Sequence, residues 1–274
     1  MLKTRILLAS ACVIVIWLIF LLPKVVVENE SELKGDSSKS GPSGRTMAKS
    51  DVHTKTPKHL ADRISKFRTN YNTSATKEKN AIFADSLAKL YAEAGKFDSA
   101  AWFSEEASKF FNTTKSWIKT GDNYYQAYTF ALDQDKLNAM AAKTQEFYTK
   151  VLKEDPNNLE IKTKMAMTYL SSANPMQGIT MLREVLAQDP KNEAAIFNLG
   201  MLSIQSGQYD RAIERLEELI KLNPKHTQGQ LLLGIAFMNK GDKAKAKEQF
   251  QKVKDMDKDP SVQATVDSYL TDLK

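Results

Sequence analysis

The sequence has one cysteine, Cys12, and three histidines among its 274 residues. A lone cysteine cannot form an internal disulfide, so no such bridge supports the fold. His53 and His59 lie in a polar segment and His226 follows a proline, so none of the three has the setting of a metal ligand. We therefore expect no metal site.

The sequence also lacks the short motifs that carry catalytic chemistry. It has no glycine-rich loop that could cradle a phosphate, no G-x-S-x-G motif and no cysteine near a histidine. We expect a protein that is not an enzyme and needs no cofactor. An enzyme on a helical scaffold is a separate alternative, because two carboxylates flanking a cleft would leave no motif.

The composition is that of a folded protein with a mild basic excess. Hydrophobic residues make up 42% of the chain and charged residues 26%, which sets it apart from disordered sequences. The formal net charge is +6 and the pI is about 9.1. This excess alone does not indicate nucleic acid, and we expect no nucleic-acid partner.

The first long apolar run extends from Ile6 to Leu22 and contains no charged residue. Its length is at the short end of a membrane span, and the valines at 25–27 could extend it. A cleaved signal peptide would have a shorter apolar region followed by a small-residue site, so residues 1–27 are interpreted as an uncleaved signal anchor.

The residues around this run suggest an orientation. The short tail before it carries Lys3 and Arg5, and such a cationic tail is hard to translocate, whereas a long C-terminal domain crosses largely regardless of charge. We expect a single-pass protein of the inner (cytoplasmic) membrane. The rest of the chain would then lie in the periplasm of a bacterium.

Residues 28–57 are rich in serine, glycine and charge, and they predict a flexible linker with a reach of roughly 30 Å. Between Lys34 and Lys79, eleven Lys or Arg residues stand against four acids. This excess has two interpretations, a solvated tether or a segment attracted to anionic lipid headgroups. The following stretch, Lys58 to Tyr71, places apolar residues on one face of a helix that could cover the open start of a stacked array.

The remainder of the chain is organised by a repeat. Pro156, Pro190 and Pro224 are separated by 34 residues each, and a fixed period of this length indicates a stacked repeat. Between the prolines, apolar residues at helical spacing lie on both sides of a Gly or Pro turn, which predicts two antiparallel helices per unit. Small residues such as Gly200 and Ala212 mark close approach of the two helices.

One unit shows the pattern clearly, with Leu199-Gly200, Ser203, Tyr209, Ala212 and Pro224 in order. This resembles the tetratricopeptide repeat, a similarity that covers roughly residues 76–274. The resemblance implies an all-α, right-handed superhelix of about five helix-turn-helix repeats with capping helices, preceded here by one transmembrane helix. The units fall near residues 81–113, 114–157, 159–192, 193–226 and 227–260, with a terminal helix at 261–273, so residues 58–274 form one solenoid domain.

The second unit is about eleven residues too long. Eleven residues are close to three helical turns, so we expect its helices, near 115–132 and 136–154, to be longer than their neighbours. The unit is also rich in aromatic residues, which either pack between these helices or form a projecting knob.

The resemblance further implies that the first helix of each unit lines a concave groove. The inward residues would be Met167, Leu170, Phe197, Met201, Ile204, Leu231, Ile235 and Met238. Such a groove is apolar and rich in methionine, which suits an amphipathic helix or an extended apolar segment. Thr163, Phe197 and Leu231 occupy positions where a carboxylate clamp would need polar residues, so an acidic C-terminal tail is disfavoured.

Three functions are compatible with these observations. The first is a membrane-anchored, non-catalytic scaffold or adaptor that holds a protein partner in its groove, as part of a bacterial envelope complex. The second is structural assembly or self-association through the convex surface, with a homo-oligomer as the product. The third is a factor that presents an apoprotein, as in cytochrome c maturation, and it rests on similar architecture only.

Overall fold

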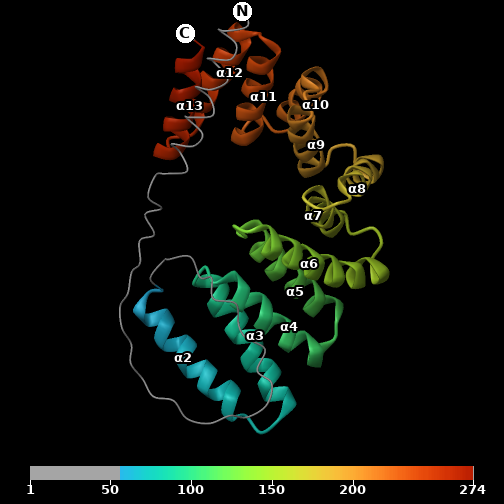
Figure 1. Cartoon of the computed structure of the whole chain (residues 1–274), viewed down its shortest axis with the longest axis vertical. Helices are drawn as coiled ribbons and strands as arrows, with labels where there is room; N and C mark the ends of the chain where they lie inside the picture. Colours follow the sequence, from blue (N-terminus) through green and yellow to red (C-terminus); the bar gives the residue numbers. More distant parts are fainter. Residues whose placement is uncertain (1–55, 274) are drawn as a thin grey trace, which may run out of the picture. The chain divides into compact units, whose positions relative to one another are not determined.

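The computed structural model describes residues 56–273, which form twelve α-helices and no strand. Figure 1 shows these helices in chain order. The expected anchor at 1–27 and the expected linker, apart from Thr56 and Pro57, lie outside the described residues. In the described range, no helix is both long enough and apolar enough to cross a membrane.

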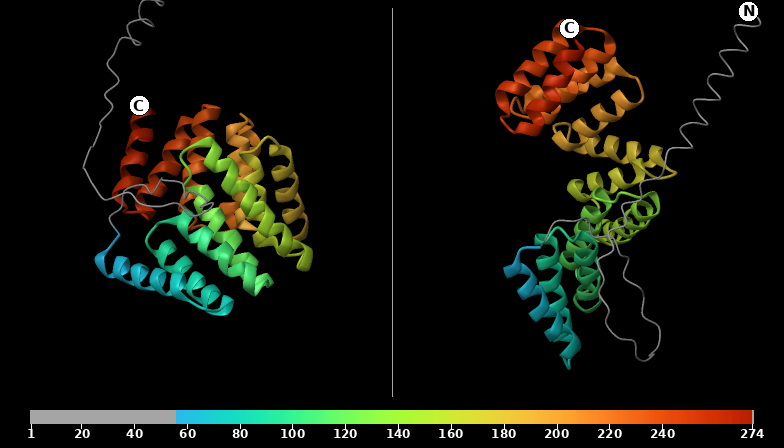
Figure 2. Two further views of the ribbon diagram at one scale, coloured as in Figure 1. Left: turned by 60° about the horizontal axis from the view of Figure 1, so that its bottom comes forward. Right: turned by 60° about the vertical axis from the view of Figure 1, so that its left-hand side comes forward.

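Ten of the described helices form five consecutive antiparallel pairs, flanked by one helix at each end, and the helices of a pair lie side by side in both views of Figure 2. The bounds are α2 Lys58–Thr73, α3 Lys77–Glu93 with α4 Phe97–Phe111, α5 Thr114–Thr129 with α6 Gln134–Glu154, α7 Leu159–Leu170 with α8 Pro175–Gln188, α9 Glu193–Gln205 with α10 Tyr209–Leu222, α11 Thr227–Lys240 with α12 Lys243–Met256, and α13 Pro260–Asp272. The predicted all-α, helix-turn-helix architecture is confirmed. The right-handed superhelical sense stays a prediction.

The proline period sets the turns between pairs. α6, α8 and α10 each end two residues before a proline of the period, since proline has no amide to continue the helix. Two residues after each proline, a side chain caps the next helix. Asn158, Asn192 and His226 accept hydrogen bonds from the amides of Ile161 (3.1 Å), Ala195 (3.0 Å) and Gly229 (3.0 Å), respectively.

Within a pair, glycine allows the two helices to meet. A Cβ on Gly200 would lie 3.0 Å from Leu216, and one on Gly234 would lie 2.6 Å from the ring of Phe250. Both partners are fully buried. The small residues in the sequence pattern therefore do mark close approach between the helices of a pair.

The two flanking helices close the apolar ends of the array. On α2, Leu60 and Ile64 are buried against the first pair, and Phe67 and Tyr71 pack beside them. On α13, Val266 is buried against the last pair and Tyr269 stacks on Phe250 with ring centroids 5.0 Å apart. The expectation that the helix beginning at Lys58 covers the start of the array is confirmed.

The second pair, α5 and α6, differs from the sequence expectation in one respect. α6 has 21 residues and is the longest described helix, but α5 has 16 and is shorter than α3, which has 17. The expectation that both helices exceed their neighbours is therefore wrong for α5. The physical reason is that Phe130 forms the C-cap of α5 and Asp133 caps α6, so the intervening residues make a connection instead of a further helical turn.

Candidate functional site

All eight residues predicted to line the groove are half-buried and lie on the first helices of three consecutive pairs, α7, α9 and α11. Half-burial is what a binding surface requires, because a fully buried side chain cannot reach a partner. Their neighbours divide them into two groups.

Six of them lie on α9 and α11, which contact each other directly. Phe197 and Ile204 of α9 pack on the same buried cluster as Leu231, Ile235 and Met238 of α11. Met201 lies four residues after Phe197 and three before Ile204, which places it on the same side of α9. We call the surface formed by Phe197, Met201, Ile204, Leu231, Ile235 and Met238 the α9–α11 face.

A ring contact fixes the start of this face. Phe197 stacks on the imidazole of His226, with ring centroids 5.3 Å apart. The Nδ1 atom of the same imidazole accepts the hydrogen bond that caps α11. Since His226 is held by the helix that it caps, it fixes Phe197 of one repeat against the beginning of the next.

The α9–α11 face is almost free of charge. α9 carries one charged residue, Glu193 at its first position, and α11 carries one, Lys240 at its last. Glu193 accepts a hydrogen bond from Asn223 (2.8 Å), and Lys240 pairs with Asp210 (2.5 Å). A ligand for the middle of this face would therefore meet apolar side chains and methionine, without a charge to recognise.

Met167 and Leu170 of α7 lie apart from the other six. A Cβ on Gly178 would be 2.9 Å from Leu170 Cδ2, so Leu170 packs inside its own pair. The carbonyl of Met167 accepts a hydrogen bond from the Tyr128 hydroxyl (3.0 Å), which also bonds Ser171 (2.6 Å). α7 is thereby linked to α5. Leu170 also packs on the cluster that contains Ala195 and Leu199 of α9, but neither Met167 nor Leu170 packs on the cluster beneath the α9–α11 face.

Ion pairs join the first helices of the earlier repeats, in addition to the apolar cluster that α5 and α7 share. Lys119 of α5 pairs with Asp85 of α3, and Lys164 Nζ of α7 lies 2.8 Å from Asp122 Oδ1 of α5. Asp122 also accepts a hydrogen bond from the buried hydroxyl of Tyr148 (2.7 Å). This ladder was not predicted from the sequence, although the 34-residue separation of Asp85 and Lys119 equals the repeat period.

The two lysines of this ladder respond oppositely to their surroundings. Burial lowers the pKa of Lys119, and the hydrogen bond and charge of Asp85 only partly offset it. Burial also acts to lower the pKa of Lys164, but Asp122 and Glu160 together outweigh it and raise that pKa. Both ladder carboxylates, Asp85 and Asp122, are held in ion pairs.

The described residues 56–273 hold no group of three or more His, Cys, Asp or Glu side chains that could share a metal ion. The arrangement consists of apolar and ion-paired surfaces on packed helices. Such surfaces can hold a partner.

The tetratricopeptide repeat model matches residues 138–199, 177–217 and 203–267. A comparison with curated proteins found no match. Among solved structures, MamA 41-end from Desulfovibrio magneticus RS-1 is 20% identical, with a TM-score of 0.50, and the match covers 64% of this chain and 94% of that one.

Two further solved structures are less similar in geometry. A crystal structure of MamA protein is 19% identical with a TM-score of 0.49, covering 64% of this chain and 91% of that one. YrrB, described as a TPR protein with an unusual peptide-binding site, is 16% identical with a TM-score of 0.46, covering 76% and 97%. At these identities the likeness concerns the fold alone. The predicted repeats are confirmed over residues 138–267, the part of the chain that the tetratricopeptide repeat model matches.

Proposed function

We propose that this protein is a non-catalytic scaffold that binds an apolar or amphipathic segment of a partner protein on the α9–α11 face. The observation that carries this proposal is the combination of six half-buried apolar side chains on two adjacent helices with only one charged residue on each helix. Contiguous apolar surface of this kind usually marks an interaction site.

The chemistry of the face suggests the kind of partner. Met201 and Met238 are unbranched and polarizable, and they adapt to differently shaped apolar groups. An amphipathic helix would place its apolar stripe across α9 and α11 and leave its polar side in water. Contacts through Met167 and Leu170 would belong to a longer ligand that also reaches α7.

We also propose where in the cell the protein lies. Residues 6–22 would anchor the chain in the inner membrane, with the repeats on the periplasmic side. Protease treatment of intact cells with a permeabilised outer membrane tests this part. Digestion of the repeats supports the proposal, and protection until the inner membrane is broken contradicts it.

Crosslinking and affinity recovery of the full-length protein from its own membranes test the binding proposal. The variant Met201→Asp with Ile235→Asp places two charges in the middle of the α9–α11 face. The matched control is Met176→Asp with Met256→Asp, because these side chains are already 62% and 39% exposed and lie on α8 and α12. Circular dichroism verifies that both variants keep their helical content.

We expect the partner to be lost with the first variant and kept with the control. A peptide copied from the crosslinked segment of the partner should then bind the purified chain and not the first variant. Recovery of the same partners with both variants would move the function to another surface, and recovery of only a second copy of this chain would indicate self-association. Unfolding of the first variant would show that these residues belong to the core.

A further inference from the structure

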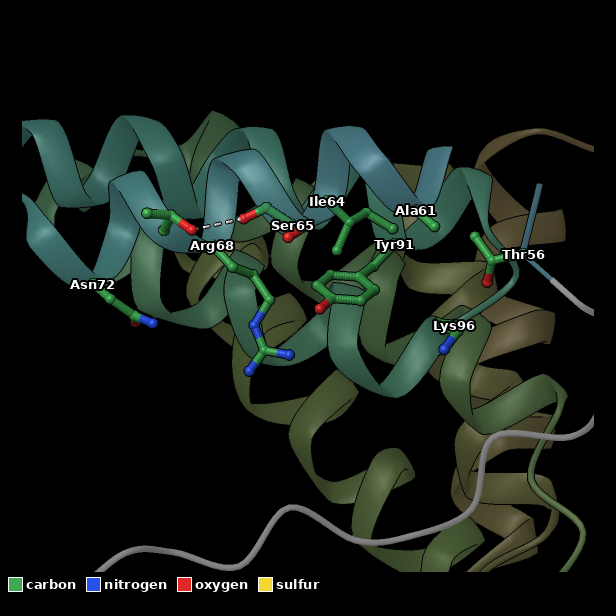
Figure 3. Close-up of a pocket in the computed structure, with 9 residues that line it drawn as sticks. Thr56, Ala61, Ile64, Ser65, Arg68, Asn72, Tyr91 and Lys96 are labelled. Carbon is green, nitrogen blue, oxygen red and sulfur yellow. Dashed lines mark hydrogen bonds between the residues drawn. The ribbon is translucent and has the colours of Figure 1, made fainter. Parts of the chain in front are cut away.

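A second site lies at the other end of the array, far along the chain from the α9–α11 face. A pocket of about 400 Å³ opens between α2 and the turn that joins α3 to α4. Its polar lining comes from Ser65, Arg68, Thr69 and Asn72 of α2, Tyr91 of α3, and Lys96 before α4 (Figure 3). Such a volume is in the range of ligand sites.

Tyr91 gives this pocket a polar group with no internal partner. Its side chain is only 6% exposed and its ring stacks on Phe103 at 5.4 Å. Within residues 56–273 its hydroxyl makes no hydrogen bond, and in Figure 3 it points toward the guanidinium of Arg68. The ring is therefore fixed by packing, while its hydroxyl is open to a ligand in the pocket.

The charged side chains among the described residues of the lining are basic. Arg68 and Lys96 lie on either side of the Tyr91 ring in Figure 3, and within residues 56–273 no acidic residue lines the pocket. α2 as a whole carries four Lys or Arg residues and one acid, Asp62. No side chain caps its N-terminus, which lies at the Thr56 end of the pocket and adds a partial positive charge there. The site therefore favours an anionic group.

The length of the pocket favours a peptide over a small ion. Its lining follows α2 from Ala61 to Asn72, which at 1.5 Å per residue is about 17 Å, and continues to Thr56 before the helix. An extended segment of roughly seven residues spans the whole of this lining. The hydroxyl of Ser65 and the amide of Asn72 could bond its backbone, while a carboxylate reaches Arg68 and Tyr91.

We propose that this pocket binds an extended acidic segment of a partner protein, with one carboxylate held between Arg68 and the Tyr91 hydroxyl. The site uses other residues and other chemistry than the α9–α11 face, so the two proposals can fail separately.

Fluorescence polarisation with the full-length chain tests the proposal. The probes are labelled seven-residue peptides of alanine and serine that carry two glutamates at varied spacing, each with a version that has glutamine instead. We expect the best glutamate peptide to bind at least tenfold more tightly than its glutamine version. Its affinity should fall as the salt concentration is raised from about 50 to 300 mM.

Three variants connect binding to the pocket. Arg68→Gln should lower the affinity for the glutamate peptide by about tenfold or more. Tyr91→Phe, which keeps the stacked ring, should lower it by about threefold to tenfold. Arg183→Gln removes the same charge from an exposed residue of α8 and should leave binding within about twofold, because it acts only through distant, screened charge.

Several outcomes would overturn the proposal. They are no binding by any glutamate peptide, equal binding of the glutamate and glutamine versions, or an Arg68→Gln effect no larger than that of Arg183→Gln. If inorganic phosphate alone shifts the NMR signals of Tyr91 and Arg68 while no peptide binds, the pocket is a site for a free anion. The Tyr91 hydroxyl makes no hydrogen bond within residues 56–273, so we expect Tyr91→Phe to keep its helical content, and such a variant separates loss of binding from loss of structure.

Discussion

Gly234 shows how tightly the repeats depend on a single missing side chain. A Cβ at this position would lie 2.6 Å from the fully buried ring of Phe250, and the ring is also stacked on Tyr269. We predict that Gly234→Ala destabilises the protein by about 1–3 kcal/mol, because the ring has no free space into which it can move.

Urea unfolding followed by circular dichroism measures this change. Lys247→Ala on the exposed side of α12 is the control and should alter the free energy of unfolding by less than about 0.5 kcal/mol. A Gly234→Ala variant as stable as the parent would mean that α11 and α12 separate without cost.

Two buried tyrosine hydroxyls make the stability of the folded protein depend on pH. Burial and the hydrogen bond to Glu105 raise the pKa of Tyr124, and burial and the charge of Asp122 raise that of Tyr148. Because a raised folded pKa favours the protonated form, the resulting stability is fully present below pH 10 and is lost as the pH rises above it.

We predict that these two of the nine tyrosines ionise only when the chain unfolds. Absorbance at about 295 nm, followed during alkaline titration, counts the tyrosinates. The Tyr124→Phe, Tyr148→Phe double variant should lose the late step and keep the earlier ones. Ionisation of all nine near pH 10 in a chain that is still helical would contradict the assignment.

At the residue scale, the sequence predicted packing better than polar contacts. Gly200 and Gly234 recur at one position of the repeat, so the pattern exposed their role in close approach. Asp122 and Lys164 are 42 residues apart, which is not the repeat period, because the long α6 lies between them. The pocket around Tyr91 could not be predicted either, since its residues come from α2, α3 and a turn that no periodicity relates.

At the scale of one element, α2 closes the first pair without being part of a repeat. Leu60 is almost fully buried in the cluster that includes Leu87 and Phe103. We predict that Leu60→Ala costs about 2–5 kcal/mol of local stability through the lost burial and the cavity left behind.

Hydrogen exchange measured by mass spectrometry should place this loss on α2, α3 and α4. In a stacked array each unit contacts only its neighbours, so exchange in α11 and α12 should stay unchanged. Equal acceleration along the whole array would show that the repeats unfold as one unit.

The helix bounds were predictable where proline marks them and less so elsewhere. The prolines at 156, 190 and 224 are each preceded by a C-cap residue and followed by an N-cap, so the turns follow from the sequence. No proline separates α5 from α6, and the apolar Phe130 and Leu132 extend the helical pattern into what is a connection. The same periodicity placed six groove residues together, but α7 is held to α5 by hydrogen bonds that hydrophobic spacing does not reveal.

At the scale of the molecule, the contact between the third and fourth pairs is the weak point of the described array. Its buried cluster is small, with Ala166, Leu182, Val185, Ala195 and Leu199. Among the described residues, no side-chain hydrogen bond or ion pair joins α7 and α8 to α9 and α10. Burial lowers the pKa of Arg215 of α10, and the charge of Arg183 of α8 lowers it further, because the two guanidinium groups repel each other across this contact.

We predict that Val185→Asp uncouples unfolding at this contact. A charge on this fully buried residue removes the cluster, so denaturant unfolding should split into two transitions. Hydrogen exchange should assign the first transition to the pairs next to residue 185 and show α11 to α13 still protected. A single transition at lower denaturant would show that the array keeps its cooperativity without this cluster.

The ion-pair ladder of α3, α5 and α7 and the apolar contacts of α9 and α11 respond to salt in opposite directions. Dissolved ions screen the attraction of Lys119 for Asp85 and of Lys164 for Asp122, although partial burial limits the effect. Excluded salts such as sulfate strengthen apolar burial. The two ends of the array therefore differ in how their stability depends on salt. The ionic strength of the surroundings decides which end unfolds first when a partner exerts force on the array.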